Sequence, residues 1–407
     1  MNIDQGDHMI NTGKTSTRKR TAVAVVALGL VVGACSSSSG DGDDAVETET
    51  VPTAPADDDA IVPDGTGAPT DTEAPDDSAP TSDEVEVVQS EGGRLAAVQE
   101  AGVIRCGAND ALPGFGVIDS AGDYAGFDID LCRAVAAGVL GDADAVEYVP
   151  LTADARFPAL QSGEVDLIIR NTTWTASRDG GQGGNFLFTT FYDGQGVMVP
   201  ESSGITDLEG LADATICVLS GTTTELNLSS VFTARGIPYT PSVYDDNTTL
   251  QPAYEQGQCE AWTADASALA SGKSAIEGNG GETQFIIPEV ISKEPLGPVV
   301  ADGDTEWASA VEWSVMATVQ AWEFGLDSTN IAEYSGDDPS ILTFIGQGDD
   351  VASGLGLPTD YAVQVVSQVG NYQEIYTTHI EPIGLALEGS PNNLWTEGGL
   401  MYVPPFR

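Results

Sequence analysis

Histidine and cysteine are scarce in this sequence, and each shortage excludes a kind of site. The two histidines, His8 and His379, are too few for a histidine-rich zinc or haem centre. The five cysteines include no Cys-x-x-Cys pair, which argues against a zinc ribbon. No Gly-x-x-x-x-Gly-Lys-Ser/Thr motif is present, so a P-loop nucleotidase is not supported. We therefore expect no metal site and no cofactor.

Basic side chains are also few, since lysine and arginine number 14 against 63 acidic residues. The formal net charge of −49 repels a nucleic-acid backbone and an anionic membrane surface, so we expect no nucleic-acid partner. The 407 residues, of which 41% are hydrophobic, are enough for two or three domains with substantial cores.

The first 34 residues are typical of an export signal. Basic residues between positions 14 and 20 precede the uncharged, largely apolar stretch 21–34. This stretch is shorter than the roughly 20 residues that a membrane-spanning helix needs. We therefore interpret 1–34 as a signal peptide.

The signal ends in Val-Gly-Ala-Cys at 32–35, which resembles the lipobox of bacterial lipoproteins, where the cysteine is diacylated after cleavage. An ordinary signal peptide followed by a chance cysteine is the alternative. The serine-rich stretch that follows favours the lipobox. We expect Cys35 to carry lipid and to anchor the exported protein to the outer face of the cytoplasmic membrane, at the cell surface or in the periplasm.

Residues 36–91 are acidic and rich in serine, glycine, threonine, proline and alanine, without lysine, arginine or aromatic residues. Such a segment buries too little apolar surface to offset the entropy of ordering. We interpret 35–91 as the lipidated cysteine followed by a disordered acidic tether.

From residue 92 onward, short apolar segments alternate with helical patterns, which predicts an α/β fold with parallel strands. Asp128 is expected to cap the first long helix, and 305–324 is expected to form an amphipathic helix. Two such runs follow one another, so we expect two lobes. The predicted strands are 104–107, 146–151, 165–170, 215–219, 239–244 and 260–263, and the predicted helices are 128–139, 156–161, 222–233 and 248–256.

Four cysteines remain beyond the leader, an even number that indicates two disulfides in an exported domain. Three pairings are possible. Cys106–Cys132 and Cys217–Cys259 are favoured because each pair lies within one predicted lobe; four buried free thiols are the alternative.

The strand ends carry polar residues, at the edge where open α/β sheets bind ligands. After the strand at 165–170, Asn171 and Thr173 point to one side and Arg178 can fold back towards them, a set that suits a carboxylate. A surface turn with a local ion pair is the alternative. Trp174 is expected to pack at the rim of the cleft.

Two further strand ends complete a set of charges. Thr222 and Glu225 form a Ser/Thr-x-x-Glu capping box, and the helix start also presents free N–H groups, with Thr223 placed to meet an anion. Asp265 either caps the next helix or pairs with an ammonium group. A cation, N–H donors and an anion together match the two ends of an amino-acid zwitterion.

Seven segments, spread over 94–407, resemble the polar-amino-acid solute-binding proteins of ABC importers, in particular the general L-amino-acid-binding branch. They are Gly-Phe-Asp-Ile-Asp at 126–130, Arg-Phe-Pro-Ala-Leu-Gln-Ser-Gly at 156–163, Asn-Thr-Thr-Trp-Thr-Ala-Ser-Arg at 171–178, Phe-Tyr-Asp-Gly-Gln-Gly at 191–196, Ser-Gly-Thr-Thr-Thr-Glu at 220–225, Ile-Ser-Lys-Glu-Pro-Leu-Gly at 291–297 and Tyr-Val-Pro-Pro-Phe-Arg at 402–407.

The resemblance implies a type II periplasmic-binding-protein fold, with two α/β lobes joined by two crossing segments and a ligand cleft between them. The crossings are expected near 194–199 and 294–299. This gives lobe 1 at 92–194, lobe 2 at 195–296, and a return to lobe 1 with a C-terminal extension at 297–407.

The resemblance also implies roles for single residues. Arg178 matches the arginine that clamps the carboxylate, and Thr223 matches a donor at the helix start of the second lobe. Asn171 and Thr173 match positions that hold the amino group, through a backbone carbonyl, and the carboxylate. Asp265 matches the acid that holds the amino group.

Two further positions bear on the ligand's side chain. Arg156 matches an arginine that glutamate and aspartate binders use there, which favours acidic or amide side chains; a solvated helix residue is the alternative. Many relatives place an aromatic ring over the ligand from the first loop. Here only Phe115 can take that part, which indicates a looser pocket and broad specificity.

The resemblance implies a monomeric, non-enzymatic receptor that captures L-amino acids by cleft closure and delivers them to an ABC permease and its ATPase. One alternative is a dehydratase-like enzyme on the same scaffold, with Asp265 or Glu225 as its acid or base. A sensory amino-acid-binding module is the other.

Overall fold

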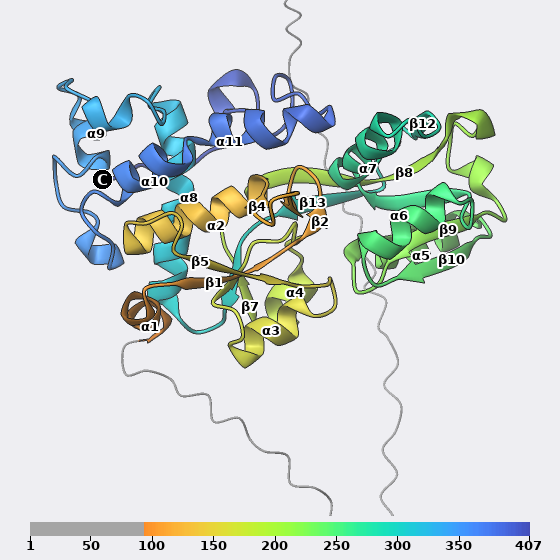
Figure 1. Cartoon of the computed structure of the whole chain (residues 1–407), viewed down its shortest axis with the longest axis horizontal. Helices are drawn as coiled ribbons and strands as arrows, with labels where there is room; N and C mark the ends of the chain where they lie inside the picture. The colour runs from red at the N-terminus through yellow and green to blue at the C-terminus, as the bar shows by residue number, and fades with distance from the viewer. Residues whose placement is uncertain (1–92) are drawn as a thin grey trace, which may run out of the picture. The chain divides into compact units, whose positions relative to one another are not determined.

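The computed structural model describes residues 93–407, shown as a ribbon in Figure 1. The predictions of a signal peptide at 1–34, a lipid on Cys35 and a tether at 35–91 lie outside the described residues. Across 93–407, every helix is too short or too polar to span a bilayer.

The first lobe is built on a five-stranded sheet in the order β5-β1-β6-β14-β7. β1 runs parallel to β5 and β6, and β14, which returns late in the sequence, is antiparallel to β6 and β7. The strand predicted at 165–170 is much shorter, because the chain leaves the sheet to place Arg170 and Asn171 beside the pocket described below. The strands are β1 (Ile104–Ala108), β5 (Val146–Pro150), β6 (Leu167–Ile168), β7 (Gly184–Phe186) and β14 (Val299–Ala301).

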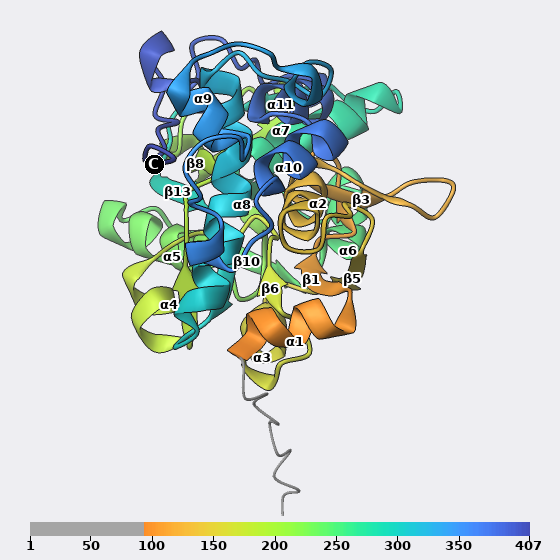
Figure 2. The ribbon, with the colours of Figure 1, turned by 90° about the vertical axis from the view of Figure 1, so that its left-hand side faces the viewer.

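Helices α2, α8 and α10 pack side by side against this sheet and bury the largest apolar cluster of the described chain (Figures 1 and 2). The amphipathic helix predicted at 305–324 is confirmed as α8, whose apolar face is buried. The helices of this lobe are α1 (Gly93–Ala101), α2 (Phe127–Leu140), α3 (Arg156–Ser162), α4 (Ala176–Gly181), α8 (Thr305–Glu323), α9 (Pro339–Phe344), α10 (Tyr361–Val369) and α11 (Tyr372–His379).

The prediction that Asp128 caps α2 is wrong. The cap position is Gly126, which makes no side-chain cap bond, and α2 begins at Phe127. Gly126 has φ 143°, and a Cβ there would lie 2.1 Å from the Phe115 carbonyl oxygen, so only glycine fits. The Asp128 carboxylate instead accepts the Asn171 N–H at 2.6 Å, and this bond ties α2 to the loop after β6.

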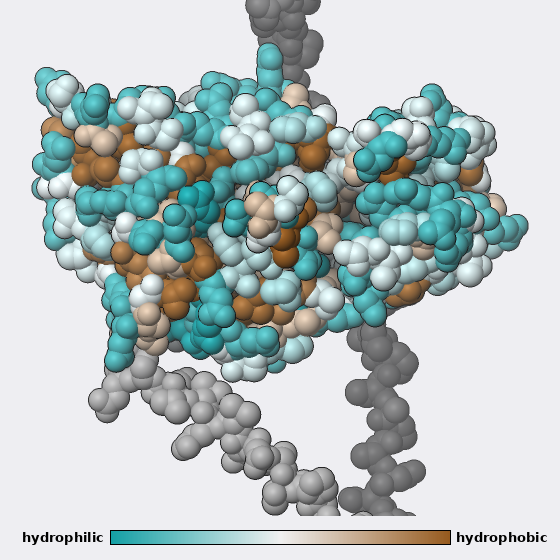
Figure 3. All heavy atoms as spheres, viewed as in Figure 1, coloured by the Kyte–Doolittle hydropathy of each residue, from teal (hydrophilic) through white to brown (hydrophobic). Residues whose placement is uncertain are grey.

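The second lobe contains a six-stranded sheet in the order β10-β9-β11-β8-β12, with β13 also paired to β8. β9 runs parallel to β10 and β11, which confirms the second predicted α/β run. Figure 3 shows hydrophilic side chains over α5, α6 and β10 on the face in view. The elements are β8 (Phe191–Pro200), β9 (Thr215–Leu219), β10 (Thr240–Tyr244), β11 (Ala261–Asp265), β12 (Gln284–Ile286), β13 (Ser292–Leu296), α5 (Thr223–Arg235), α6 (Asn247–Glu255) and α7 (Ala266–Gly278); β2 (Ala111–Leu112), β3 (Gly116–Ile118) and β4 (Tyr124–Ala125) form a small third sheet.

The antiparallel strands β8 and β13 carry the chain between the lobes. Phe191 and Leu296, which face each other in this pair, belong to the core of the first lobe. Val197 and Val199, further along β8, belong to the core of the second lobe. The Asn392 side chain accepts the Tyr192 N–H at 2.7 Å and donates to the Tyr192 carbonyl at 3.2 Å, so the C-terminal segment contacts the start of the first crossing strand.

Both favoured disulfides are present. Cys106–Cys132 joins β1 to α2 in the first lobe, and Cys217–Cys259 joins β9 to the segment before β11 in the second. The two bonds close loops with sequence separations of 26 and 42 residues.

Removing either disulfide is expected to lower the free energy of unfolding by roughly 3–4 kcal/mol, because the unfolded chain gains loop entropy. Urea unfolding of a Cys217→Ser/Cys259→Ser variant, beside a Cys106→Ser/Cys132→Ser variant, measures this. Unfolding midpoints equal to that of the unsubstituted protein would show that neither bond stabilises the fold.

Candidate functional site

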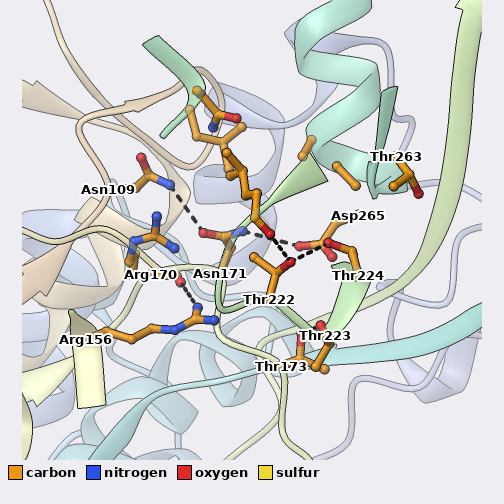
Figure 4. Close-up of a pocket in the computed structure, with 15 residues that line it drawn as sticks. Asn109, Arg156, Arg170, Asn171, Thr173, Thr222, Thr223, Thr224, Thr263 and Asp265 are labelled. Atoms are coloured by element: carbon orange, nitrogen blue, oxygen red, sulfur yellow. Dashed lines mark hydrogen bonds between the residues drawn. The ribbon is translucent and has the colours of Figure 1, made fainter. Parts of the chain in front are cut away.

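A pocket of about 490 Å³, including its open mouth, lies between the two lobes (Figure 4). Its walls come from the segments after β1, β6 and β9 and from the end of β11, which is the sheet edge where the sequence predicts ligand binding. Of the predicted site residues, Arg156, Asn171, Thr173, Thr223 and Asp265 line the pocket, whereas Phe115 and Arg178 do not.

Asp265 is a buried acid without an ion-pair partner among residues 93–407; only 7% of the residue is exposed. It occupies the cap position of α7, yet its side chain makes no capping bond to the helix. Its carboxylate instead accepts a hydrogen bond from Asn171 Nδ2 at 3.3 Å. Burial, and then the negative charges of Asp193 and Glu294, raise the pKa of Asp265 well above its ordinary value.

Asn171 connects the two lobes at the centre of the pocket, as Figure 4 shows. Its backbone has a φ of 31°, an uncommon conformation for a residue other than glycine. The bond from its N–H to Asp128 holds this backbone. Its side-chain oxygen accepts from Asn109 Nδ2 at 3.3 Å while its Nδ2 donates to Asp265. The side chain is therefore oriented from both sides.

Two buried guanidinium groups line the opposite wall. Arg156 is 2% exposed and donates from Nη1 to Thr172 Oγ1 at 3.2 Å, while its Nε finds no acceptor among the described residues. Arg170 donates from Nε to the Leu151 carbonyl at 2.6 Å. Burial lowers the pKa of Arg156, and it lowers that of Arg170 to about 10. Two buried positive charges line this wall, and Arg156 keeps an unpaired donor, so the wall favours an anion.

Arg178 lies one layer behind the pocket wall. Its Nη1 donates to the Thr173 carbonyl at 2.9 Å, and its Nη2 reaches the Gly221 carbonyl, in the other lobe, at 3.4 Å. The guanidinium also lies over the Phe157 ring, 5.7 Å from its centroid. It is buried and adjacent to the pocket, and its weakest contact is the long one to Gly221.

The threonines from the two lobes meet beside Arg178. Thr173 Oγ1 and Thr223 Oγ1 are 3.4 Å apart. Thr223 is the first residue of α5, and Thr222 caps the helix because its Oγ1 accepts the Glu225 N–H at 3.1 Å. The predicted capping box is only half formed, since the Glu225 side chain does not return to the Thr222 N–H. The Glu225 carboxylate accepts the Gly221 N–H and does not line the pocket, which removes it as a catalytic acid or base there.

Gly221 lets the lobes approach closely. Its φ is 65°, and a Cβ at this position would lie 1.7 Å from Asp154 Oδ1 in the other lobe. The neighbouring Ser220 hydroxyl donates to Asp154 Oδ2 at 2.7 Å. Together with the contacts of Asn171 and Thr173, this bond places the lobes in a closed arrangement.

The prediction that Phe115 covers the ligand is wrong. Its ring is fully buried in the core of the first lobe, edge-on to Phe127 and Phe191 at centroid distances of 6.0 and 5.2 Å. Leu112, from the same loop, lines the pocket in its place. The Trp174 ring stacks on Phe186, which agrees with its predicted packing role.

Several pocket residues were missed by sequence reasoning. Arg170 could have been found, because it directly precedes Asn171 at a strand end. Thr222 and Thr224 flank the predicted Thr223, and the capping-box pattern explains this segment as a helix start without a role in binding. Asn109 and Asn247 carry no local signal, since they reach the pocket only through the packing of distant loops. The residues missed are Asn109, Leu112, Arg170, Leu219, Thr222, Thr224, Asn247, Thr263, Ala264 and Ala268.

Known proteins are similar to this chain in sequence and in fold. Residues 104–324 match the family model of bacterial extracellular solute-binding proteins, family 3. The putative amino-acid ABC transporter-binding protein YhdW of Escherichia coli is 43% identical over 78% of this chain and 93% of its own length. The glutamate/glutamine/aspartate/asparagine-binding protein BztA of Rhodobacter capsulatus is 44% identical over 76% and 92%.

The solved structure of an ABC transporter periplasmic binding protein from Brucella ovis with glutathione bound has a TM-score of 0.72 and 40% identity, over 77% of this chain and 99% of that chain. The two sheets, the two crossing strands and the pocket between the lobes are those of a type II periplasmic-binding-protein fold. The family model also covers more than half of the chain. The chain therefore belongs to family 3 of the bacterial extracellular solute-binding proteins.

Proposed function

We propose that this protein captures L-amino acids, with a preference for acidic or amide side chains, and delivers them to an ABC permease. One observation carries the proposal: within residues 93–407 the pocket places a buried acid that has no ion-pair partner, Asp265, across from a buried cation with an unused donor, Arg156. A ligand that carries both an ammonium group and an acid satisfies both residues at once.

The ammonium group and the α-carboxylate of an amino-acid ligand can each be placed in this pocket. The ammonium group is placed at the Asp265 carboxylate, beside Asn171. The α-carboxylate is placed between Thr173 and Thr223, where Arg178 exchanges its 3.4 Å contact with the Gly221 carbonyl for a charged acceptor. Each lobe supplies part of each contact. The ligand therefore binds the closed state more tightly than the open state and stabilises it.

Arg156 is placed to meet the far end of the ligand's side chain. Its guanidinium, which lines the pocket, suits a carboxylate or an amide oxygen and offers nothing to an aliphatic side chain. The name of one relative agrees with this preference, since BztA is named for glutamate, glutamine, aspartate and asparagine. Glutathione, bound in the Brucella ovis structure, also carries a free amino-acid end and belongs in any ligand panel.

The setting follows from the family and from the leader sequence. An extracellular solute-binding family implies export. We further propose that Cys35 is lipidated, that the chain acts as a monomer, that the two domain borders fall near 194 and 296, and that the pocket performs no catalysis. Glu225, one of two candidate acids for an enzyme, is engaged with Gly221 outside the pocket.

A thermal-shift panel of the twenty amino acids and glutathione on residues 92–407 tests the ligand class. A ligand at about 100 times its dissociation constant stabilises the protein by about 2.7 kcal/mol, and glutamate and glutamine are expected to give the largest shifts. Asp265→Asn is expected to weaken glutamate binding about 10- to 100-fold, because a charge-assisted hydrogen bond is lost. Glu225→Gln, a nearby acid outside the pocket, is the matched control; equal affinity of Asp265→Asn and the control would refute the ammonium site.

Substitutions of Arg156 and Arg178 are expected to differ in effect: one changes the preference for acidic ligands, and the other changes the affinity for all amino acids. Arg178→Gln weakens binding of every amino acid about 10-fold or more, because all of them carry the α-carboxylate. Arg156→Gln weakens glutamate and aspartate by a similar factor and leaves alanine nearly unchanged. Calorimetric titration of both variants with glutamate and alanine measures the two ratios, and a uniform loss in Arg156→Gln would remove its role in specificity.

Affinity is expected to fall as the pH decreases. The ammonium group needs an ionised Asp265, whose pKa burial raises, so acid protonates the site before the ligand can pair with it. The negative charge of Asp193, whose own pKa burial raises to about 6, and that of Glu294 raise the pKa of Asp265 further. Glutamine serves as the ligand because its side chain does not titrate. Its affinity should drop between pH 8 and pH 5, and Asp265→Asn should flatten the profile; an equally steep profile in that variant would exclude Asp265 as the titrating group.

A further inference from the structure

The two crossing strands each carry an acid, and the two acids face each other. Asp193 on β8 is the register partner of Glu294 on β13. Like charges directly opposite in a sheet are destabilising. Neither residue forms an ion pair within 93–407, and neither lines the pocket. The hydrogen bonds of the two carboxylates explain why both acids are present.

Asp193 caps helix α7 from the neighbouring strand. Its Oδ2 accepts a hydrogen bond from the Ser267 hydroxyl and another from the Ser267 N–H at 3.3 Å. Ser267 is the second residue of α7, where N–H groups have no partner within the helix and the helix dipole favours a negative charge. Asp193 thus makes the bond that the residue at the cap position ordinarily makes.

This arrangement frees Asp265. Asp265 occupies the cap position of α7, where an aspartate normally folds back onto the helix N–H groups. Asp193 already accepts the Ser267 N–H, and the Asp265 side chain makes no capping bond and turns to Asn171 in the pocket wall. One acid holds the helix so that the next can face the ligand.

Glu294 holds the start of helix α5 through side-chain bonds, whereas Thr222 caps its backbone. Its Oε2 accepts the Thr223 hydroxyl at 2.8 Å, and its Oε1 accepts Asn227 Nδ2 at 2.9 Å as well as the Ser292 hydroxyl. Thr223 is the first residue of α5 and Asn227 lies one turn further along. Glu294 is 1% exposed, so these bonds compensate a fully buried carboxylate.

We propose that Asp193 and Glu294 are positioning residues that fasten the starts of α7 and α5 to the two crossing strands, and so aim Asp265 and Thr223 at the ligand. The inference rests on the proposed function, because it needs Asp265 to bind an ammonium group. The strands that join the lobes and the residues that bind the ligand then form one hydrogen-bonded unit. Cleft closure therefore brings Asp265 and Thr223 to the ligand together.

A double-mutant cycle with L-glutamate tests the role of Asp193. Asp193→Ala is expected to weaken glutamate about 10-fold, within the range that a lost helix cap covers. Asp193→Asn keeps an acceptor for Ser267 and is expected to stay within about 3-fold of the unsubstituted protein. In the Asp265→Asn background, Asp193→Ala should change affinity less than about 3-fold, because no charge remains to be positioned.

Glutarate, which is glutamate without its amino group, gives a readout that a general loss of stability does not move. Asp193→Ala should leave glutarate binding unchanged, since that ligand has no ammonium group. Glu294→Ala should weaken both ligands, because Thr223 serves the carboxylate, and Glu294→Gln should restore part of the loss. If Asp193→Ala does not fold, Ser267→Ala removes the same bond from the helix side and is expected to weaken glutamate alone.

The outcomes separate this inference from the function on which it rests. If the unsubstituted protein binds no amino acid, the proposed function fails and the inference with it. If Asp265→Asn weakens glutamate while Asp193→Ala does not, or if the two losses simply add, the function stands and the positioning role of Asp193 is overturned. If Asp193→Asn loses as much affinity as Asp193→Ala, the charge rather than the cap matters, and the capping account is wrong.

Discussion

The pocket between the lobes contains buried ionisable groups that have no ion-pair partner among residues 93–407, and ligand binding depends on this. Asp265 has no ion-pair partner within 93–407, and Arg156 keeps an unused donor. Burying such groups costs several kcal/mol unless a partner of opposite charge arrives. A fold that retains both groups is therefore less stable empty than filled, and the partner that fits both is a zwitterion with an acid or amide at its far end.

The contacts between the lobes are modest, and this suits a receptor that must also open. Asn171 meets Asp265 at 3.3 Å, the Thr173 and Thr223 hydroxyls are 3.4 Å apart, and Arg178 reaches Gly221 at 3.4 Å. These long bonds hold the closed arrangement only weakly at the pocket, whereas the Ser220 hydroxyl bonds Asp154 at 2.7 Å outside it. A ligand that inserts charged groups between the same partners replaces them with stronger bonds, so the free energy of closure comes largely from the ligand.

The sequence predicted the central strands and helices of both lobes, because alternating apolar segments are local signals, and it left most of the short strands and the helices after α8 unpredicted. β9 begins and ends where predicted, α8 ends within one residue, and both disulfides follow from lobe membership. The failures are tertiary. The Asp128 carboxylate accepts the Asn171 N–H and does not cap α2. The Phe115 ring packs in a core whose other rings come from distant segments of the chain. Strand ends revealed Thr223 and Asp265, whereas the facing acids on β8 and β13 needed the strand register.

The central claim is that the ligand's ammonium group is held by Asp265 while its acidic groups meet the arginines. Calorimetric titration of the unsubstituted protein with glutamate and with glutarate at pH 8 tests it most directly, since the two ligands differ only in the amino group. The account predicts that glutamate binds at least about 100-fold more tightly, as expected for a desolvated charge pair. Equal affinity for the two ligands would contradict it.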